Sequence, residues 1–161
     1  MEDFNLPRKN WILFAIFLLV AGLPGFSQTP EQEVETVIRS LFDGMKQKNV
    51  PQVEAAFSKE GLMQTVLQKP EGTSIASNSV ADFLNRIAST PASTVLDEQI
   101  LSYHIQVDGP VAIAWTPYKF YVNNSFSHCG VNSFQLVKLP GGWKIVYIID
   151  TRRKEPCEEI L

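Results

Sequence analysis

The fold is decided by residues 111–150, which read VAIAWTPYKFYVNNSFSHCGVNSFQLVKLPGGWKIVYIID. Branched and aromatic residues alternate with polar ones through this stretch, which is typical of strands that bury one face. Turn residues interrupt the alternation at Asn123-Asn124 and Gly141-Gly142, and a further turn precedes it at Asp108-Gly109-Pro110. The pattern predicts four antiparallel strands, at about 96–107, 111–122, 126–139 and 143–153.

The sequence upstream of these strands predicts three helices. The first begins at Thr29-Pro30-Glu31-Gln32, where a capping threonine precedes a proline and a glutamine. Its apolar residues then recur every three or four positions. A second, short helix begins at Pro51 and ends by Gly61, and a third opens at Ser79-x-x-Asp82. Between them we expect a brief strand over 62–67 and a loop over 68–77. These elements make an α+β domain.

Two-residue turns would set the pairing of the strands and so decide which face each side chain takes. A turn at Asn123-Asn124 pairs Trp115 with Asn132, and a turn at Gly141-Gly142 pairs Phe134 with Ile149. One face then collects the large apolar side chains, which the helices must cover. Its members are Leu101, Tyr103, Ile105, Val111, Ile113, Trp115, Phe134, Leu136, Trp143, Ile145, Tyr147 and Ile149.

The opposite face is smaller and more polar, so we expect it to be solvated or to form a homodimer. It carries Ala112, Ala114, Thr116, Tyr118, Ser127, Cys129, Ser133, Gln135, Lys144 and Asp150.

The chain has two cysteines, Cys129 and Cys157. The predicted pairing places Cys129 opposite Lys154, so the tail needs only to fold back for the two to meet. In an oxidising compartment an isolated pair of this kind is more often a disulfide than a metal site or a nucleophile. We therefore predict a disulfide.

The N-terminus has the layout of a secretory signal peptide. Arg8 and Lys9 precede an apolar run over residues 11–23, which is shorter than the roughly 20 residues that a membrane-spanning helix needs. Small residues at Gly25 and Ser27 suit a cleavage site. We expect a signal peptide over 1–27 and one domain over 28–161, periplasmic or secreted, with no stable membrane anchor after cleavage.

The charge pattern argues against nucleic acid as a partner. The net charge is −3, and the basic cluster at residues 152–154 is followed at once by Glu155, Glu158 and Glu159. We interpret this tail as solvated and self-neutralising.

Several short motifs suggest a family. They are Trp115-x-x-Tyr118-x-Phe120, Ser127-His128-Cys129-Gly130-Val131, Phe134-x-Leu136-x-Lys138 and Gly142-Trp143-Lys144-Ile145. With three helices before a long sheet, residues 30–157 resemble the nuclear transport factor 2-like superfamily, and within it the exported SnoaL-like or putative lumazine-binding bacterial branch. The resemblance implies a cone-shaped, curved antiparallel sheet with about three N-terminal helices on its concave face and a pocket inside. Some members are isomerases, cyclases or dehydratases that use an Asp/His pair there, and many have no known activity.

The predicted pairing gathers hydrogen-bonding groups on an apolar floor at the open end of the cone. These are Tyr103, Trp115, Tyr121, His128, Asn132 and Thr151, with Arg153 close by. Such a composition indicates either a small-molecule pocket or the polar rim of a core. His104 and His128 are the only histidines and have no ligand-spaced acidic or cysteine cluster, so we expect no metal and no cofactor.

His128 is the candidate general acid or base, since its reference pKa is about 6.5. It lacks an acidic partner in the predicted sheet, because Asp150 falls on the opposite face. Its neighbours Ser127 and Cys129 also point to the other side of the strand, so His128 cannot easily activate them. The first hypothesis is therefore an exported, non-catalytic domain that binds an unidentified small molecule. The alternatives are an isomerase or lyase that uses His128, and a cone whose cavity is filled by aromatic side chains.

Overall fold

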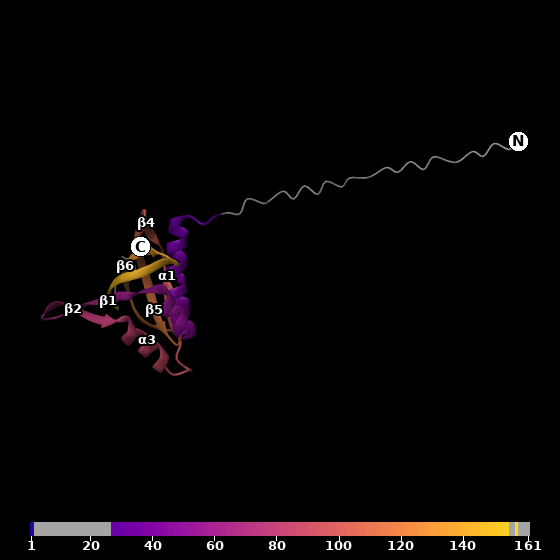
Figure 1. Ribbon diagram of the computed structural model, residues 1–161. Helices are drawn as coiled ribbons and strands as arrows, with labels where there is room; N and C mark the ends of the chain where they lie inside the picture. Colours follow the sequence, from indigo (N-terminus) through magenta and orange to yellow (C-terminus); the bar gives the residue numbers. More distant parts are fainter. Residues whose placement is uncertain (2–26, 155–156, 158–161) are drawn as a thin grey trace.

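The computed structural model describes Met1, residues 27–154 and Cys157. The described residues form three helices, all on one side of a curved sheet (Figure 1). They are α1 (Pro30–Gln47), α2 (Val50–Ala56) and α3 (Val80–Ser89). The predicted caps are present: Thr29 Oγ1 accepts from the backbone N–H of Gln32, and Ser79 Oγ accepts from that of Asp82. The predicted signal peptide lies almost wholly outside the described residues.

The sheet has the order β2-β1-β7-β6-β5-β3, with β4 also paired to β5. Its strands are β1 (Phe57–Lys69), β2 (Gly72–Ser79), β3 (Leu96–Ile100), β4 (His104–Asp108), β5 (Val111–Val122), β6 (Ser125–Leu139) and β7 (Gly142–Thr151). The predicted α+β fold is confirmed. The sheet is mixed rather than wholly antiparallel, because β1 runs parallel to β7.

Two predicted segments differ in detail. The loop expected over 68–77 is wrong: β1 and β2 form a hairpin that turns at Pro70-Glu71, and Gly72, which follows the turn, has a φ of 137° that suits glycine. The strand expected over 96–107 is divided into β3 and β4, which pair with different parts of β5. None of the described helices is both long and apolar enough to cross a lipid bilayer.

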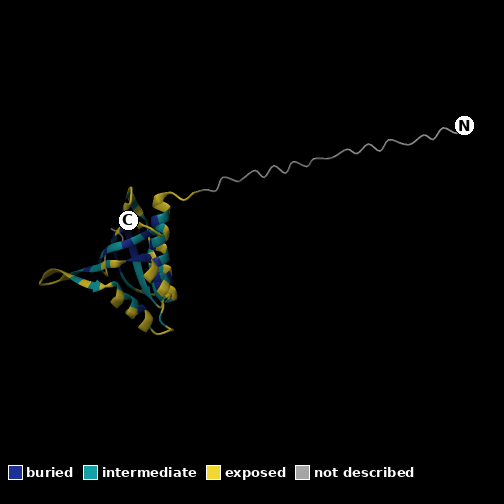
Figure 2. Cartoon of the chain, viewed as in Figure 1, coloured by how far each residue is buried: buried dark blue, intermediate teal, exposed yellow. Residues whose placement is uncertain are grey.

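The core lies between the helices and the inner face of the sheet (Figure 2). Val34, Ile38 and Leu41 form the buried stripe of α1, as its spacing predicts. They belong to one cluster with Phe134 and Ile145 of the sheet. Burial of this apolar surface is the main force that holds the helices on the strands.

A β-bulge inverts the predicted orientation of β5. The turn at Asn123-Asn124 is as predicted, since Val122 pairs with Ser125. The pairing then shifts by one residue between Phe120 and Tyr121, and Trp115 pairs with Ser133. A one-residue shift turns every later side chain to the other face.

The expected inner positions of Val111, Ile113 and Trp115 are therefore wrong. Trp115 is 53% exposed, whereas Ala114 and Thr116 are buried. The turn between β4 and β5 has two residues, Gly109 and Pro110, so that His104 lies opposite Trp115 on the outer face.

A second bulge acts on β7. The hairpin turns one residue earlier than predicted, so that Leu139 pairs with Gly142. The pairing shifts again between Gln135 and Leu136, which leaves Val146 as the extra residue. Asp150 is consequently buried, at 7% exposure, on the inner face. The expectation that Ile149 points inward and Asp150 outward is wrong.

The predicted disulfide between Cys129 and Cys157 is present, with its Cα atoms 5.9 Å apart. The chain returns to β6 through a bridge between Cys129 and Arg153, one residue from the predicted partner Lys154. The bond therefore fastens the segment after β7 to the middle of β6.

Candidate functional site

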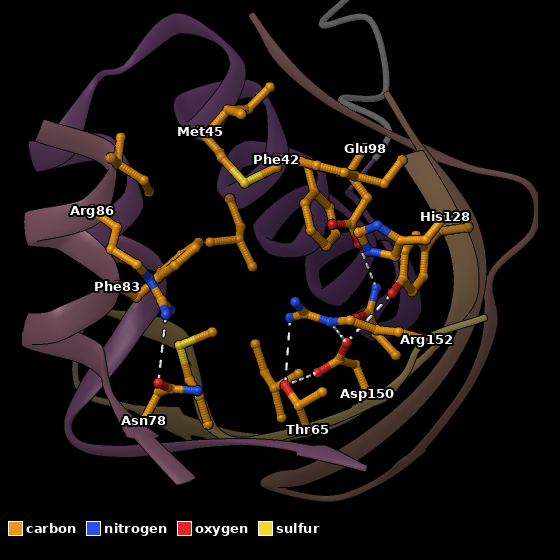
Figure 3. A pocket seen from close by; sticks show the side chains of 18 of the residues that line it. Phe42, Met45, Thr65, Asn78, Phe83, Arg86, Glu98, His128, Asp150 and Arg152 are labelled. Carbon is orange, nitrogen blue, oxygen red and sulfur yellow. Dashed lines mark hydrogen bonds and ion pairs between the residues drawn. The ribbon is translucent and has the colours of Figure 1, made fainter. Parts of the chain in front are cut away.

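A cavity of about 370 Å³ lies between the helices and the inner face of the sheet (Figure 3). On one side is a mostly apolar surface from α1 and α3, here called the helical wall: Leu41, Phe42, Met45, Phe83, Arg86 and Ile87. On the other side the strands and the residue after β7 supply what we call the polar cluster: Thr65, Glu98, Tyr118, His128, Asn132, Asp150 and Arg152. The large aromatics line this space without filling it, so the hypothesis of a plugged cone is wrong.

Asp150 is the centre of the polar cluster. Its Oδ1 accepts a hydrogen bond from Thr65 Oγ1 at 2.6 Å, and its Oδ2 lies 2.6 Å from Arg152 Nε and 3.3 Å from the Tyr118 hydroxyl. Those contacts occupy both carboxylate oxygens. Asp150 is thus better placed to orient its neighbours than to take a proton from a ligand.

Tyr118 and Arg152 are held by this carboxylate. The Tyr118 hydroxyl also lies 3.0 Å from the carbonyl oxygen of Thr151, and burial raises the pKa of Tyr118, so the phenol is neutral. Arg152 Nη2 lies 3.4 Å from Thr65 Oγ1. Figure 3 shows the guanidinium reaching from the strand side into the middle of the cavity.

Glu98 and Asn132 form the second pair in the cluster, because Asn132 Nδ2 donates to Glu98 Oε1 at 2.7 Å. Burial and the nearby charge of Asp150 raise the pKa of Glu98 to about 7, against the opposing effects of Asn132 and Arg152. Glu98 is therefore close to half-protonated at neutral pH and can donate or accept a proton.

His128 stands beside these groups. Its Nδ1 lies 3.0 Å from Ser127 Oγ, and its ring packs edge-on against Tyr118 at a centroid distance of 5.8 Å. Burial, reinforced by the charge of Arg152, lowers the pKa of His128. The imidazole is neutral at pH 7. Among the described residues, no carboxylate lies within 4.0 Å of its nitrogens.

Residues 29–148 match the model of the family described as "Putative lumazine-binding". The chain belongs to this family. The predicted membership of the nuclear transport factor 2-like superfamily is confirmed as well. No curated protein matches the chain.

Solved structures share the fold of this lumazine-binding family member at low sequence identity. A nuclear transport factor 2-like protein with a cystatin-like fold from Novosphingobium aromaticivorans has a TM-score of 0.62 and 14% identity, over 82% of this chain and 88% of its own. A superfamily protein from Salmonella enterica has a TM-score of 0.60 and 19% identity, over 78% and 92%. A protein from Streptomyces avermitilis described as a putative dehydratase has 0.59 and 15%, over 79% and 100%. These three structures share with the chain the fold of helices packed on a curved sheet.

The structure brings together two of the predicted site residues in this family member, His128 and Asn132, which both line the cavity. Thr151 borders it: its carbonyl oxygen meets Tyr118, and its hydroxyl accepts from the Val131 backbone N–H at 3.3 Å. Tyr121 packs on Phe126, beyond the first bulge.

Tyr103 and Trp115 line a separate surface groove that involves β4 and β5, together with His104 and Ile113. Trp115 reaches this groove because the first bulge turns it outward. Tyr103 packs against the core and lies under the guanidinium of Arg39, 4.6 Å from the ring centroid.

Sequence reasoning missed Glu98, Asp150, Arg152 and Thr65. Glu98 had a visible signal, since it stands between Leu96 and Ile100 on one face of a strand, where an apolar residue is expected. Arg152 was assigned to the solvated tail, whereas it follows directly on β7. Among the described residues, no three His, Cys, Asp or Glu side chains gather as a metal ion requires.

Proposed function

We propose that this is an exported domain that binds a small organic molecule in its cavity. The cavity carries the proposal, because it joins an apolar helical wall to a hydrogen-bonding polar cluster. The described fold encloses this space without plugging it. The family description supports a flat, heterocyclic molecule such as lumazine as the first ligand to test.

The second candidate is an isomerase or lyase that moves a proton in the same cavity. It is favoured by the inward position of Asp150, which puts carboxylates and His128 in one site. The neighbour from Streptomyces avermitilis described as a putative dehydratase agrees with this possibility. Binding remains the better-supported function, because Asp150 is occupied by Thr65 and Arg152.

Thermal-shift and calorimetric titration of the exported, oxidised protein with lumazine and a library of small organic molecules test the proposal. We expect at least one saturable ligand, weakened by His128→Ala in the cavity and unaffected by His104→Ala on the outer side of the sheet. Each hit is then followed by NMR for conversion. Conversion that His128→Ala abolishes would favour the enzyme, and a library without any ligand would refute the binding function.

The proposal includes export and a homodimer through the outer sheet face. The disulfide between Cys129 and Cys157 suits an oxidising compartment. The outer face is more apolar than the sequence predicts, since Val111, Ile113 and Trp115 point outward. Mass spectrometry of the exported protein should find Gln28 at its N-terminus, and light scattering should find twice the mass of the chain.

A further inference from the structure

Arg152 is the cavity group best prepared to hold a charged ligand. Its Nε is bound by Asp150 at 2.6 Å and its Nη2 lies 3.4 Å from Thr65 Oγ1, so the guanidinium is fixed from the strand side. Among the described residues its other N–H groups have no hydrogen-bond partner, and the side chain is 54% exposed. Figure 3 shows the group in the middle of the cavity. A guanidinium held in this way presents a planar edge that suits the two oxygens of a carboxylate.

The charges around the cavity also favour an anion. Asp150 balances Arg152, but Arg86 of α3 lines the cavity as a second cation. Arg86 has Asn78 Oδ1 at 3.5 Å, and among the described residues no carboxylate lies within 4.0 Å of it. The pKa of Glu98 is raised to about 7, so its carboxyl carries a smaller negative charge below neutral pH.

The helical wall is suited to an aromatic body. Phe42, Met45 and Phe83 belong to it, and Phe120 adds a ring from the sheet. Aromatic rings pack favourably against one another and against methionine sulfur. A volume of about 370 Å³ is near the lower limit of ligand pockets, about 300 Å³, so the occupant is small.

We infer that the ligand is a small aromatic carboxylic acid, whose carboxylate pairs with the guanidinium of Arg152 while its ring lies against the helical wall. This inference rests on the proposed binding function and names the chemical class of the ligand. Asp150 and Thr65 are the positioning residues, because they orient Arg152.

The test compares 2-naphthoate with its uncharged amide, 2-naphthamide, by calorimetric titration of the oxidised protein at pH 6.5. We expect the acid to bind at least tenfold more tightly than the amide. Arg152→Gln should weaken the acid at least tenfold and weaken the amide much less, so that the difference between the two ligands disappears. Arg39→Gln, an exposed arginine of α1 outside the cavity, is the matched control and should change neither affinity.

Arg152→Lys is the second variant, in case Arg152→Gln does not fold. It keeps the positive charge beside Asp150 but loses the planar edge, so the acid should bind at least threefold more weakly than it does to the unaltered protein. Equal binding of acid and amide to the unaltered protein would overturn the inference, and so would full discrimination in both Arg152 variants. Binding of lumazine without 2-naphthoate would overturn it and leave the proposed function standing, whereas a protein that binds nothing would refute both.

Discussion

The helices and the strands contribute opposite kinds of surface to the cavity. The helical wall is apolar apart from Arg86, and its residues Leu41 and Ile87 also belong to the core. The polar cluster instead joins side chains from five strands through hydrogen bonds centred on Asp150 and Glu98. The helical wall thus combines core packing with an apolar contact surface, while the strands supply the polar and titratable groups. Truncations in the helical wall should therefore act most strongly on the free energy of unfolding, and changes in the polar cluster on its pH dependence and on the charge preference of binding.

Leu41→Ala should have the largest effect on stability. Leu41 is 1% exposed on the inner face of α1, so its truncation removes apolar contact and leaves a void. We expect the free energy of unfolding to fall by about 3 kcal/mol in urea denaturation. Ile75→Ala, at a position 60% exposed on β2, is the control and should cost less than about 0.5 kcal/mol. Equal losses would show that α1 does not close the core.

Gly130→Ala should lower the free energy of unfolding by a steric clash between β6 and the end of β7. A Cβ at this position would overlap the carbonyl oxygen of Thr151 and come within 3.0 Å of the Tyr118 hydroxyl. The end of β7 must then move away from β6, which we expect to cost about 2 kcal/mol in the same measurement. Ser133→Ala, on the outward side of β6, is the control. A Gly130→Ala protein as stable as the original would mean that these strands are not so close.

The same contrast explains what the sequence could predict. The helical period runs unbroken through α1, so the buried side of the helix follows directly from the spacing of Val34, Ile38 and Leu41. The strands alternate with a period of two, and a single extra residue inverts every later position. The extra residues of the two bulges, Ser127 on β6 and Val146 on β7, are of this kind.

His128 and Asn132 were placed correctly because β6 keeps its even residues inward between the two bulges. Asp150 was misplaced because it lies beyond the second bulge, on β7. The disulfide was still predicted correctly, because the segment after β7 can shift by one residue and still bring Cys157 to Cys129.

Glu98→Gln should change the pH dependence of the free energy of unfolding, which the substitutions of Leu41 and Gly130 should not. The native state holds the Glu98 proton more tightly than the unfolded chain does, since its pKa is raised from 4.5 to about 7. The free energy of unfolding should therefore fall as the pH rises between these values. Glutamine keeps the contact with Asn132 and removes the charge. At pH 8 we expect the variant to be about 1 to 2 kcal/mol more stable than the original protein, with a ceiling of about 3 kcal/mol.

At pH 4 the two proteins should unfold with nearly the same free energy, because Glu98 is then protonated in both states. Glu60→Gln, an exposed position on β1, is the control and should show no such pH-dependent gain. The titration of His128 affects both proteins equally and cancels in the difference. A constant difference between pH 4 and pH 8 would mean that the carboxyl of Glu98 is not held in its neutral form.

Trp115→Ser should have the smallest effect on folding, which tests the first bulge. If the sheet kept the pairing predicted from the turn, Trp115 would lie under the helices and its loss would cost about 3 to 5 kcal/mol. With the bulge, Trp115 is 53% exposed on the outer face, and we expect a change of less than about 0.5 kcal/mol. Because the proposed dimer uses this face, the variant should instead shift the mass in light scattering from dimer to monomer. Unchanged mass together with unchanged stability would place the dimer contact elsewhere, whereas a large loss of stability in the monomer would contradict the bulge itself.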